Sequence, residues 1–369
     1  MHCNVILLEP RCSSPLCPLK HFSDLSTCML TTMEASYTKI DVHSHYLPSV
    51  YRDYYLKYGP TVPDGMPTWP EWDVDAHLKM ADDMNITKSY LSVSSPGVHL
   101  VSGNDQLARE IARQVNTAGA NIKKAHPDRF GLFVSLPLPD VEGSLDELAY
   151  AMDNLDADGV ALLTNVDGYY LGHKRYEPLW AELDWRSAIV FVHPTTGCIL
   201  ETTSEHPNGV CARPAAPLTQ WANPLFEFFF DTTRAIINMF YTGAIARYPN
   251  INYIVAHTGA CLPPLIERFA TFGSLSDVDP SVSPDFVKEK LRQQFLFDLA
   301  GLPFPDQLRG LMPFVGKNQV LYGSDYPFTN AQMVQRLGDM MGQYMPEIFT
   351  TDEERRMVYS HNAERLLQK

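Results

Sequence analysis

The sequence is short of positive charge and contains no long apolar run. Its 369 residues include 29 Lys and Arg against 43 Asp and Glu, which gives a formal charge of −14. Broad nucleic-acid binding needs a basic surface, so this class of function is excluded. An anionic substrate would need local positive charge, such as a metal ion or a placed arginine. No run approaches the roughly 18 apolar residues that span a membrane, so we expect no membrane partner.

Cysteine is sparse and does not form a regular framework. Among the seven cysteines, Cys3, Cys12, Cys17 and Cys28 precede the first periodic segment of the chain. An odd number without regular spacing indicates reduced thiols and a cytosolic setting. A metal cluster near the N-terminus is the alternative, but no CxxC pair supports it.

Residues 1–36 have no periodic pattern and are rich in Ser, Thr, Pro and Cys. No basic residue precedes the short apolar stretch at the start, which argues against a secretory signal peptide. We expect a disordered extension, or sequence upstream of a start at Met29 or Met33. The folded part is then one domain over residues 37–369.

From residue 39 onward, short apolar or β-branched runs alternate with helical patterns. Most runs are nearly continuous in apolar residues, as is typical of parallel strands buried on both faces. The eight runs cover residues 39–45, 89–95, 130–138, 159–164, 188–194, 251–257, 295–301 and 319–327. Helical periodicity fills several gaps, over residues 74–84, 104–125, 144–155 and 232–248.

Eight strands alternating with helices predict an α/β fold, a (β/α)8 TIM barrel. A doubly wound open sheet is the rival, but no Gly-rich phosphate turn follows the first run. Two longer stretches, residues 46–73 and 195–225, are rich in Pro and aromatic residues and follow runs one and five. Loops at the carboxyl ends of barrel strands build the active site, so we expect these stretches to form its walls.

The first run ends in His43-Ser44-His45. Residues i and i+2 of a strand face the same side, roughly 6.6 Å apart, so two imidazoles at a barrel mouth could bind one metal ion. Two ordinary polar residues at a strand end are the alternative. Three other runs end in the same manner, in His193, His257 and Asp325. The joint pattern favours a metal centre at the carboxyl face of a barrel.

This arrangement resembles the amidohydrolase superfamily, whose barrels present HxH on strand one, His on strands five and six, and Asp on strand eight. The resemblance implies that His43, His45, His193 and Asp325 hold the metal. Binuclear members add a carboxylated Lys on strand four, where this sequence reads GVALLT, so one metal is expected. Asp41 could orient a ligand imidazole, or could be a plain strand-end residue.

Within that superfamily, the sequence resembles the aminocarboxymuconate-semialdehyde decarboxylase branch over residues 39 to about 367. The matching segments are KIDVHSHYLP, HPDRFGLFVSLPLP, FVHP, ARYPNINYIVAHTGACLP and LYGSDYPF. The segments DGMPTWPEW, VSSPGVHL, DGVALLTN and FEFFFDTTRAI look most like 6-methylsalicylate decarboxylases.

The sequence departs from parts of this branch. The resorcylate decarboxylases have Glu at the position of His43 and a Glu at the position of Ala260. The aminocarboxymuconate enzyme binds a carboxylate with an Arg in the loop after strand one, but no Arg occurs between Arg52 and Arg109. A smaller substrate with one carboxylate therefore fits better. A second family Arg, which reaches the neighbouring subunit's site, matches Arg268 and implies a homodimer.

The resemblance implies a carboxy-lyase that protonates the ring carbon bearing the carboxylate. A metal bound to the carboxylate and the ortho phenol oxygen would fix and polarise the ring. We expect Asp325 to transfer the proton and His257 to assist, although the two roles could be exchanged. Trp72, Trp221 and Phe228 are candidates for an aromatic pocket wall, although each alone is more often a core residue. His99 and His173 are expected to be loop or surface residues without a role.

Three functions remain open at this point. The first is decarboxylation of an aromatic hydroxy acid, with 6-methylsalicylate to 3-methylphenol favoured and isoorotate or another hydroxybenzoate as alternatives. The second is metal-dependent hydrolysis of a lactone or amide, which the same ligands permit. The third, a barrel retained for binding alone, predicts damaged ligand positions, but these are intact. Histidine-rich ligation favours zinc, while Mn or Mg also suits a site with Asp and water.

Overall fold

A computed structural model describes residues 37–201, 210–275 and 282–367. The predicted extension 1–36 lies outside the described residues. The structure has eight parallel strands in one sheet, whose order follows the chain. These strands are β1 (Lys39–His45), β2 (Ile86–Ser92), β3 (Phe130–Ser135), β4 (Gly159–Leu163), β7 (Ile189–His193), β10 (Asn252–Val255), β11 (Phe295–Asp298) and β12 (Val320–Leu321). Each overlaps one of the eight predicted runs.

The last strand lies beside the first, so the sheet closes into a barrel. The backbone amide of Val42 donates to the carbonyl of Tyr322 at 3.1 Å, and that of His45 donates to Tyr326 at 2.7 Å. A parallel bridge also joins Ser44 to Tyr326. These bonds bring the segment after β12 against the end of β1, and the (β/α)8 prediction is confirmed.

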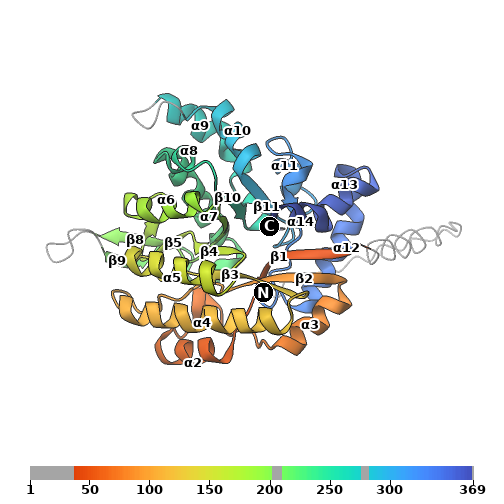
Figure 1. Cartoon of the computed structure of the whole chain (residues 1–369). Helices are drawn as coiled ribbons and strands as arrows, with labels where there is room; N and C mark the ends of the chain where they lie inside the picture. Colours follow the sequence, from red (N-terminus) through yellow and green to blue (C-terminus); the bar gives the residue numbers. More distant parts are fainter. Residues whose placement is uncertain (1–36, 202–209, 276–281, 368–369) are drawn as a thin grey trace, which may run out of the picture.

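Helices cover the outside of the barrel, and Figure 1 shows α4 and α5 running alongside β3 and β4. Their bounds are α2 (Ser49–Tyr58), α3 (Val74–Asp83), α4 (Asp105–Ala125), α5 (Val141–Asn154), α6 (Glu177–Trp185), α7 (Glu227–Tyr241), α8 (Ala244–Arg247), α9 (Ile266–Leu275), α10 (Pro284–Gln294), α11 (Gln307–Leu311), α12 (Ala331–Ile348), α13 (Asp352–Arg356) and α14 (Asn362–Leu367). None of the helices in the described part of the chain is long and apolar enough to cross a membrane.

The single helix predicted over residues 232–248 is wrong. The structure has two helices there, α7 and α8, separated by Gly243 in a left-handed conformation with φ of 72°. Glycine adopts this conformation without the steric cost that other residues meet, so it ends one helix and lets the chain turn into the next.

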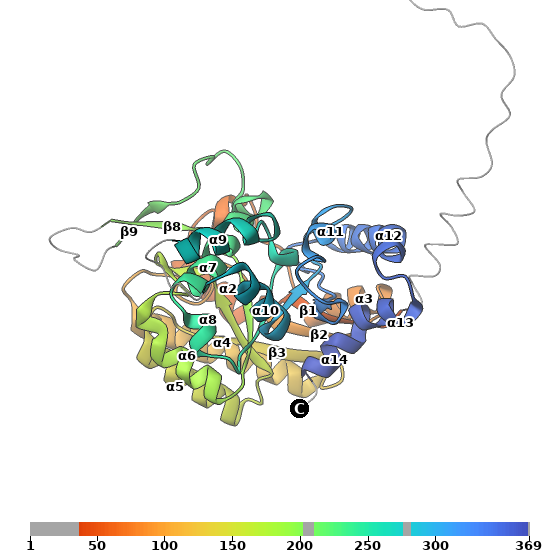
Figure 2. The same ribbon diagram turned by 90° about the horizontal axis from the view of Figure 1, so that it is seen from above.

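The two long stretches predicted as loops contain short elements. The stretch after β1 contains α2 and a 3-10 turn, Pro63–Gly65, and the stretch after β7 contains a hairpin of β8 (Cys198–Glu201) and β9 (Val210–Pro214). The hairpin extends away from the barrel in both views (Figures 1 and 2). Cys198 is disulfide-bonded, so the prediction of reduced thiols is wrong for this cysteine.

Alternation along the strands separates the barrel interior from the layer beneath the helices. On β7, Ile189 and Phe191 pack inside the barrel with Tyr90, whereas Val190 and Val192 pack toward the helices. His193 follows Phe191 by two residues, so its side chain points to the same side of the strand and its ring lies in the barrel mouth. The ring centroids of Phe191 and His193 lie 5.8 Å apart. Buried apolar side chains therefore form the floor beneath the histidine.

Candidate metal centre and active site

Four predicted metal ligands meet at the carboxyl end of the barrel. His43 and His45 end β1, His193 ends β7, and Asp325 follows β12. One ligand atom from each of the four lies within 4.8 Å of the others, so the cluster could hold a metal ion. The three histidines are almost fully buried, and the side chain of Asp325 is 18% exposed. Asp325 is therefore the most exposed member of the cluster.

Each ligand histidine has an acceptor on the far side of its ring. The Nδ1 atom lies 3.0 Å from Asp298 Oδ2 in His43, 3.3 Å from the Ser92 carbonyl in His45, and 2.7 Å from the Pro194 carbonyl in His193. Since carboxylates and carbonyls only accept, each Nδ1 carries the hydrogen and donates. When a cation occupies the cluster, the Nε2 atoms would present their lone pairs to its centre.

The inner atoms fit a bound cation. His43 Nε2 lies 3.2 Å from His45 Nε2, and Asp325 Oδ1 lies 3.4 Å from the first and 3.2 Å from the second. Lone pairs and a carboxylate at these distances repel one another unless a proton or a metal ion lies between them. Three imidazole nitrogens and one carboxylate oxygen are a donor set typical of a catalytic divalent metal.

Burial and the neighbouring charges shift the pKa values of the cluster residues in different directions. Burial lowers the pKa of His43, but the Asp298 and Asp325 carboxylates together outweigh burial and raise it to about 10. Burial and the neighbouring His45 and His43 rings hold the pKa of His193 well below its ordinary value. Burial raises the pKa of Asp325, but hydrogen bonds from the surrounding histidines hold it well below its usual range. Asp325 is therefore an anion, His193 is a neutral nitrogen donor, and His43 holds its proton until a metal ion displaces it.

Asp298 was not identified from the sequence, although it orients His43, a predicted metal ligand. It ends β11, is fully buried, and also accepts hydrogen bonds from the backbone amides of His257 and Ala300 at 3.1 and 3.0 Å. Its only signal in the sequence is a carboxylate inside the apolar run FLFDLAG. An unpaired buried carboxylate is costly, so a charged residue in a buried strand indicates a partner elsewhere in the fold.

The first of the two roles considered for Asp41, orienting an imidazole, is wrong. Asp41 accepts from the backbone amides of His43 and Ser324 at 3.1 and 3.0 Å, and from the Ser324 hydroxyl at 2.6 Å. Burial raises the pKa of Asp41 to about 7. These bonds join β1 to the turn that carries Asp325, so Asp41 positions the backbone of two ligands and not their rings.

His257 lies next to the cluster in a strained backbone segment. Its Nε2 atom lies 3.9 Å from Asp325 Oδ2. His257, Thr258 and Ala260 have positive φ values of 58°, 57° and 55°, a conformation unfavourable for residues with side chains. The ring of Phe229 stacks on the imidazole, with centroids 5.5 Å apart and an interplanar angle of 21°. The surrounding structure therefore holds His257 beside Oδ2 of Asp325.

A cavity of about 360 Å³ opens above the cluster. Its described lining residues are Asp64, Met66, Ser94, His193, Pro224, Leu225, Phe228, Phe229, His257, Gly301, Leu302, Asp325, Phe328, Thr329, Asn330 and Met333. Of the predicted wall residues, Phe228 lines this cavity. No Lys or Arg occurs among these lining residues, so the described chain offers an anionic ligand no cationic side chain there.

Three other predicted substrate-binding residues lie outside that lining. Trp72 is buried, and its Nε1–H donates to His77 Nδ1 at 3.0 Å. Trp221 is 54% exposed. Arg268 is exposed on α9, with its guanidinium 4.9 Å from the centre of the Phe272 ring.

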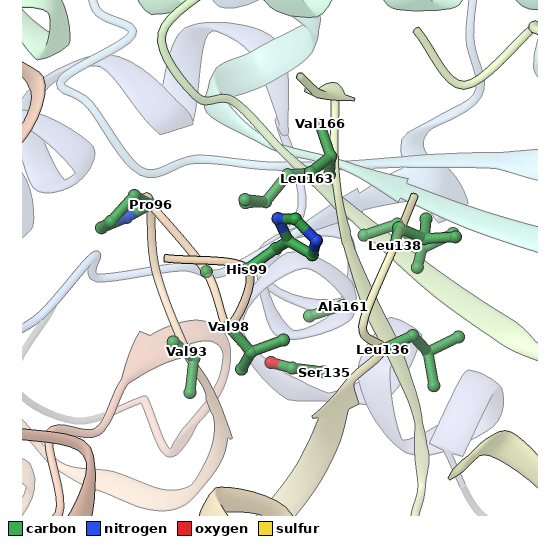
Figure 3. A pocket seen from close by; sticks show the side chains of 12 residues that line it. Val93, Pro96, Val98, His99, Ser135, Leu136, Leu138, Ala161, Leu163 and Val166 are labelled. Atoms are coloured by element: carbon green, nitrogen blue, oxygen red, sulfur yellow. The ribbon is translucent and has the colours of Figure 1, made fainter. Parts of the chain in front are cut away.

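A smaller cavity of about 20 Å³ lies beside His99 (Figure 3). Val93, Leu136 and Leu138 contribute to its apolar walls, and its volume admits about one water molecule. His99 lies in a loop, one of the two settings expected for it, and its side chain is only 2% exposed. His173 also lies in a loop, where its Nδ1 accepts from the Arg175 amide at 3.2 Å.

Comparison with known proteins agrees with this geometry. The family model described as amidohydrolase matches residues 40–369. The decarboxylase macB of Penicillium terrestre is 32% identical over 322 residues, which cover 84% of this chain and 90% of that protein. The 6-methylsalicylic acid decarboxylase of Penicillium expansum is 33% identical over 316 residues, or 84% of this chain and 91% of that protein.

Solved structures show the same fold. A crystal structure described as amidohydrolase II is 32% identical, with a TM-score of 0.77 over 90% of this chain and all of the other. The 5-carboxyvanillate decarboxylase of Novosphingobium aromaticivorans, solved with bound manganese, has a TM-score of 0.74 at 20% identity, over 91% of this chain and 98% of the other.

The chain therefore belongs to the amidohydrolase family, whose barrel and ligand pattern it carries. Within that family it falls in the aminocarboxymuconate-semialdehyde decarboxylase-like branch, beside the 6-methylsalicylic acid decarboxylases. The protein is a decarboxylase, a carboxy-lyase.

Proposed function

We propose that this protein is a metal-dependent, non-oxidative decarboxylase of an aromatic hydroxy acid, with 6-methylsalicylate to 3-methylphenol and CO2 as the favoured reaction. The observation that carries the proposal is the cluster of His43, His45, His193 and Asp325 beneath a cavity with aromatic walls. Relatives about one third identical bear the name 6-methylsalicylic acid decarboxylase, which supports this substrate.

A divalent ion held by the four ligands would bind the substrate carboxylate and withdraw electron density from the ring. Zinc suits the three imidazoles, and manganese or magnesium suits the carboxylate. The manganese in structurally similar decarboxylases makes that ion the first alternative to test.

The two oxygens of Asp325 have different surroundings. Oδ1 faces His43 and His45, whereas Oδ2 lies 3.9 Å from His257 Nε2 and accepts from the Thr329 hydroxyl at 3.2 Å. Oδ1 therefore suits the metal, and Oδ2 is the atom placed to receive a proton from His257 and pass it on. His257 would exchange that proton with Oδ2 or hold the group that does so.

Decarboxylation then requires one proton at the ring carbon that bears the carboxylate. The proton transferred to this carbon interrupts the aromatic system, the bond to the carboxylate breaks, and its electron pair restores the ring as CO2 leaves. The stacked Phe229 and the neighbouring Phe228 would pack against the substrate ring and exclude water, which strengthens the electrostatic interactions at the cluster.

The proposal includes a homodimer that shares its sites. Arg268 is exposed on α9 and is not one of the residues that line the cavity of its own chain. The described lining of that cavity contains no Lys or Arg. An arginine supplied by a second copy would give the substrate carboxylate a positive partner.

The test is elemental analysis of the purified protein combined with incubation with 6-methylsalicylate, salicylate, isoorotate and dihydroxybenzoates. We expect one divalent metal per chain, CO2 release, and phenol formation that stops when a chelator removes the metal. Lactones and amides are tested in parallel, because the same metal-binding residues would also serve a hydrolase. Acid release from those compounds without CO2 from any aromatic acid would overturn the proposal.

A further inference from the structure

Asp64 lies at the wall of the active-site cavity and has no role in the reaction just proposed. It belongs to the 3-10 turn Pro63–Gly65 in the stretch after β1. Asp64 and Asp325 are the two carboxylates among the described residues that line the cavity. Asp325 belongs to the metal cluster, so Asp64 is the lining carboxylate that the mechanism leaves unused.

The hydrogen bonds at Asp64 have a defined direction. Asn223 Nδ2 donates to Thr196 Oγ1 at 2.6 Å, and the Thr196 hydroxyl in turn donates to Asp64 Oδ1. Because the threonine oxygen already accepts from the amide, its own hydrogen is directed to Asp64. Asp64 is therefore an acceptor at Oδ1.

The second oxygen of Asp64 is left open. Oδ2 is buried and has no hydrogen-bond partner among the described residues. Burial raises the pKa of Asp64, although the Thr196 and Ser95 hydroxyls partly oppose this effect. A buried carboxylate oxygen without a partner is unfavourable, and a donor from a ligand would remove that cost.

The backbone holds this carboxylate in an unfavourable conformation. Asp64 has φ of 49° and Gly65 has φ of 77°, so two successive residues are left-handed. A Cβ atom at Gly65 would lie 3.2 Å from the Ala222 Cα, which shows how closely this turn packs on the segment before α7. A left-handed aspartate costs about 1 kcal/mol, so tertiary contacts and not local preference aim the side chain.

We propose that Asp64 determines which aromatic acids this enzyme accepts, by accepting a hydrogen bond from a ring hydroxyl at Oδ2 and excluding a second carboxylate. This inference rests on the proposed function, since it assumes an aromatic acid in the cavity. A hydroxyl offers the donor that Oδ2 lacks. A second carboxylate would bring an anion against an anion, where no described cationic side chain lines the wall.

The experiment measures dissociation constants by titration calorimetry on the metal-loaded protein. The ligands are benzoate, its 2-, 3- and 4-hydroxy derivatives, and the three benzenedicarboxylates. In the wild type, we expect at least one hydroxybenzoate to bind about 10-fold tighter than benzoate, and the dicarboxylates about 10-fold weaker. In Asp64→Leu, both differences should fall below about 3-fold.

Two further variants separate recognition from structure. Asp64→Asn keeps an acceptor oxygen without the charge, so it should retain part of the hydroxyl preference and lose the exclusion of dicarboxylates. Thr196→Val removes the donor to Oδ1 but leaves Oδ2 in place, so it should preserve both preferences. Circular dichroism on all three variants checks that the barrel is intact.

The outcomes for the two proposals are distinct. If Asp64→Leu weakens benzoate and every derivative equally, Asp64 only joins two loops and the inference is wrong. If salicylates release CO2 but ligand preference is the same in all variants, the inference fails while the proposed function stands. If no aromatic acid binds or reacts, the proposed function itself is wrong.

Discussion

The Nδ1 atom of His43 lies 3.0 Å from Oδ2 of Asp298, and both side chains are fully buried. The two residues are far apart in the chain, at the ends of β1 and β11. Their contact sets the ring nitrogen that carries the hydrogen, and so presents the other nitrogen to the metal cluster.

Asp298→Asn should weaken metal binding. The amide cannot match the charge of the carboxylate, so His43 becomes a poorer ligand, and losses of this kind are about 10- to 100-fold in affinity. Competition with a chromophoric chelator measures the affinity. Asp306→Asn, in the segment after the same strand and without a capping hydrogen bond, is the matched control and should bind metal as the wild type does. Equal affinities in the two variants would contradict this role for Asp298.

His193→Ala and Asp325→Asn should each abolish turnover and leave the fold intact. The first removes a nitrogen ligand, and the second removes the charge and the proton-holding oxygen from the centre of the site. Phenol formation and circular dichroism provide the two measurements. Activity retained in either variant, with metal present, would rule out the assigned cluster.

Arg268→Ala should be inactive if the proposed dimer shares its sites, and it should be complemented by His193→Ala. A mixed dimer would combine an intact metal site with the partner's intact arginine. Random mixing of equal amounts makes half of the dimers mixed, each with one working site, so about a quarter of wild-type activity should return. Absence of recovery in dimers shown to be mixed would place Arg268 outside the neighbouring site.

Trp72→Phe should affect stability and leave catalysis nearly unchanged. Its indole donates to His77 Nδ1 and packs edge-on against Tyr46, with ring centroids 6.2 Å apart, away from the cavity lining. Loss of that bond and of part of the ring should lower the free energy of unfolding by about 1–3 kcal/mol. Urea denaturation measures this change. A large fall in kcat/KM with unchanged stability would instead support Trp72 as a substrate contact.

His77 should make the protein less stable in acid. Burial, with the nearby Arg129 and His45 side chains, lowers the pKa of His77 to about 3, whereas an exposed histidine titrates near pH 6.5. Between these pH values the unfolded chain binds the proton and the folded chain does not, so stability falls as the pH falls through this window. The limiting slope is about 1.4 kcal/mol per pH unit.

The variant His77→Gln keeps an acceptor for Trp72 but does not titrate. Denaturation at pH 7 and pH 5 should therefore show the wild type losing about 2 kcal/mol more than the variant does. Parallel losses in the two proteins would mean that His77 is not held neutral in the folded state.

Much of the fold and of the metal site could be predicted from patterns along the chain. Buried parallel strands appear in the sequence as short apolar runs. The predicted metal ligands lie at the ends of such runs, at His43, His45, His193 and Asp325. Strand ends converge in a barrel whatever the lengths of the loops between them. The split of α7 from α8 was missed because helical periodicity continues across Gly243, where only the backbone angle ends the helix.

The sequence by itself determined the alternation of strands and helices and the donors at the strand ends, because these are local patterns with fixed periods. Only the tertiary structure decided that Asp298 supports His43 while Asp41 does not, and that Trp72 contacts His77 instead of the cavity. It also decided that Asp64 lines that cavity and that its Oδ2 atom is buried without a hydrogen-bond partner among the described residues. The contacts of Asp298 and Asp64 join residues distant in sequence, and all of these contacts depend on packing and dihedral angles that no spacing along the chain encodes.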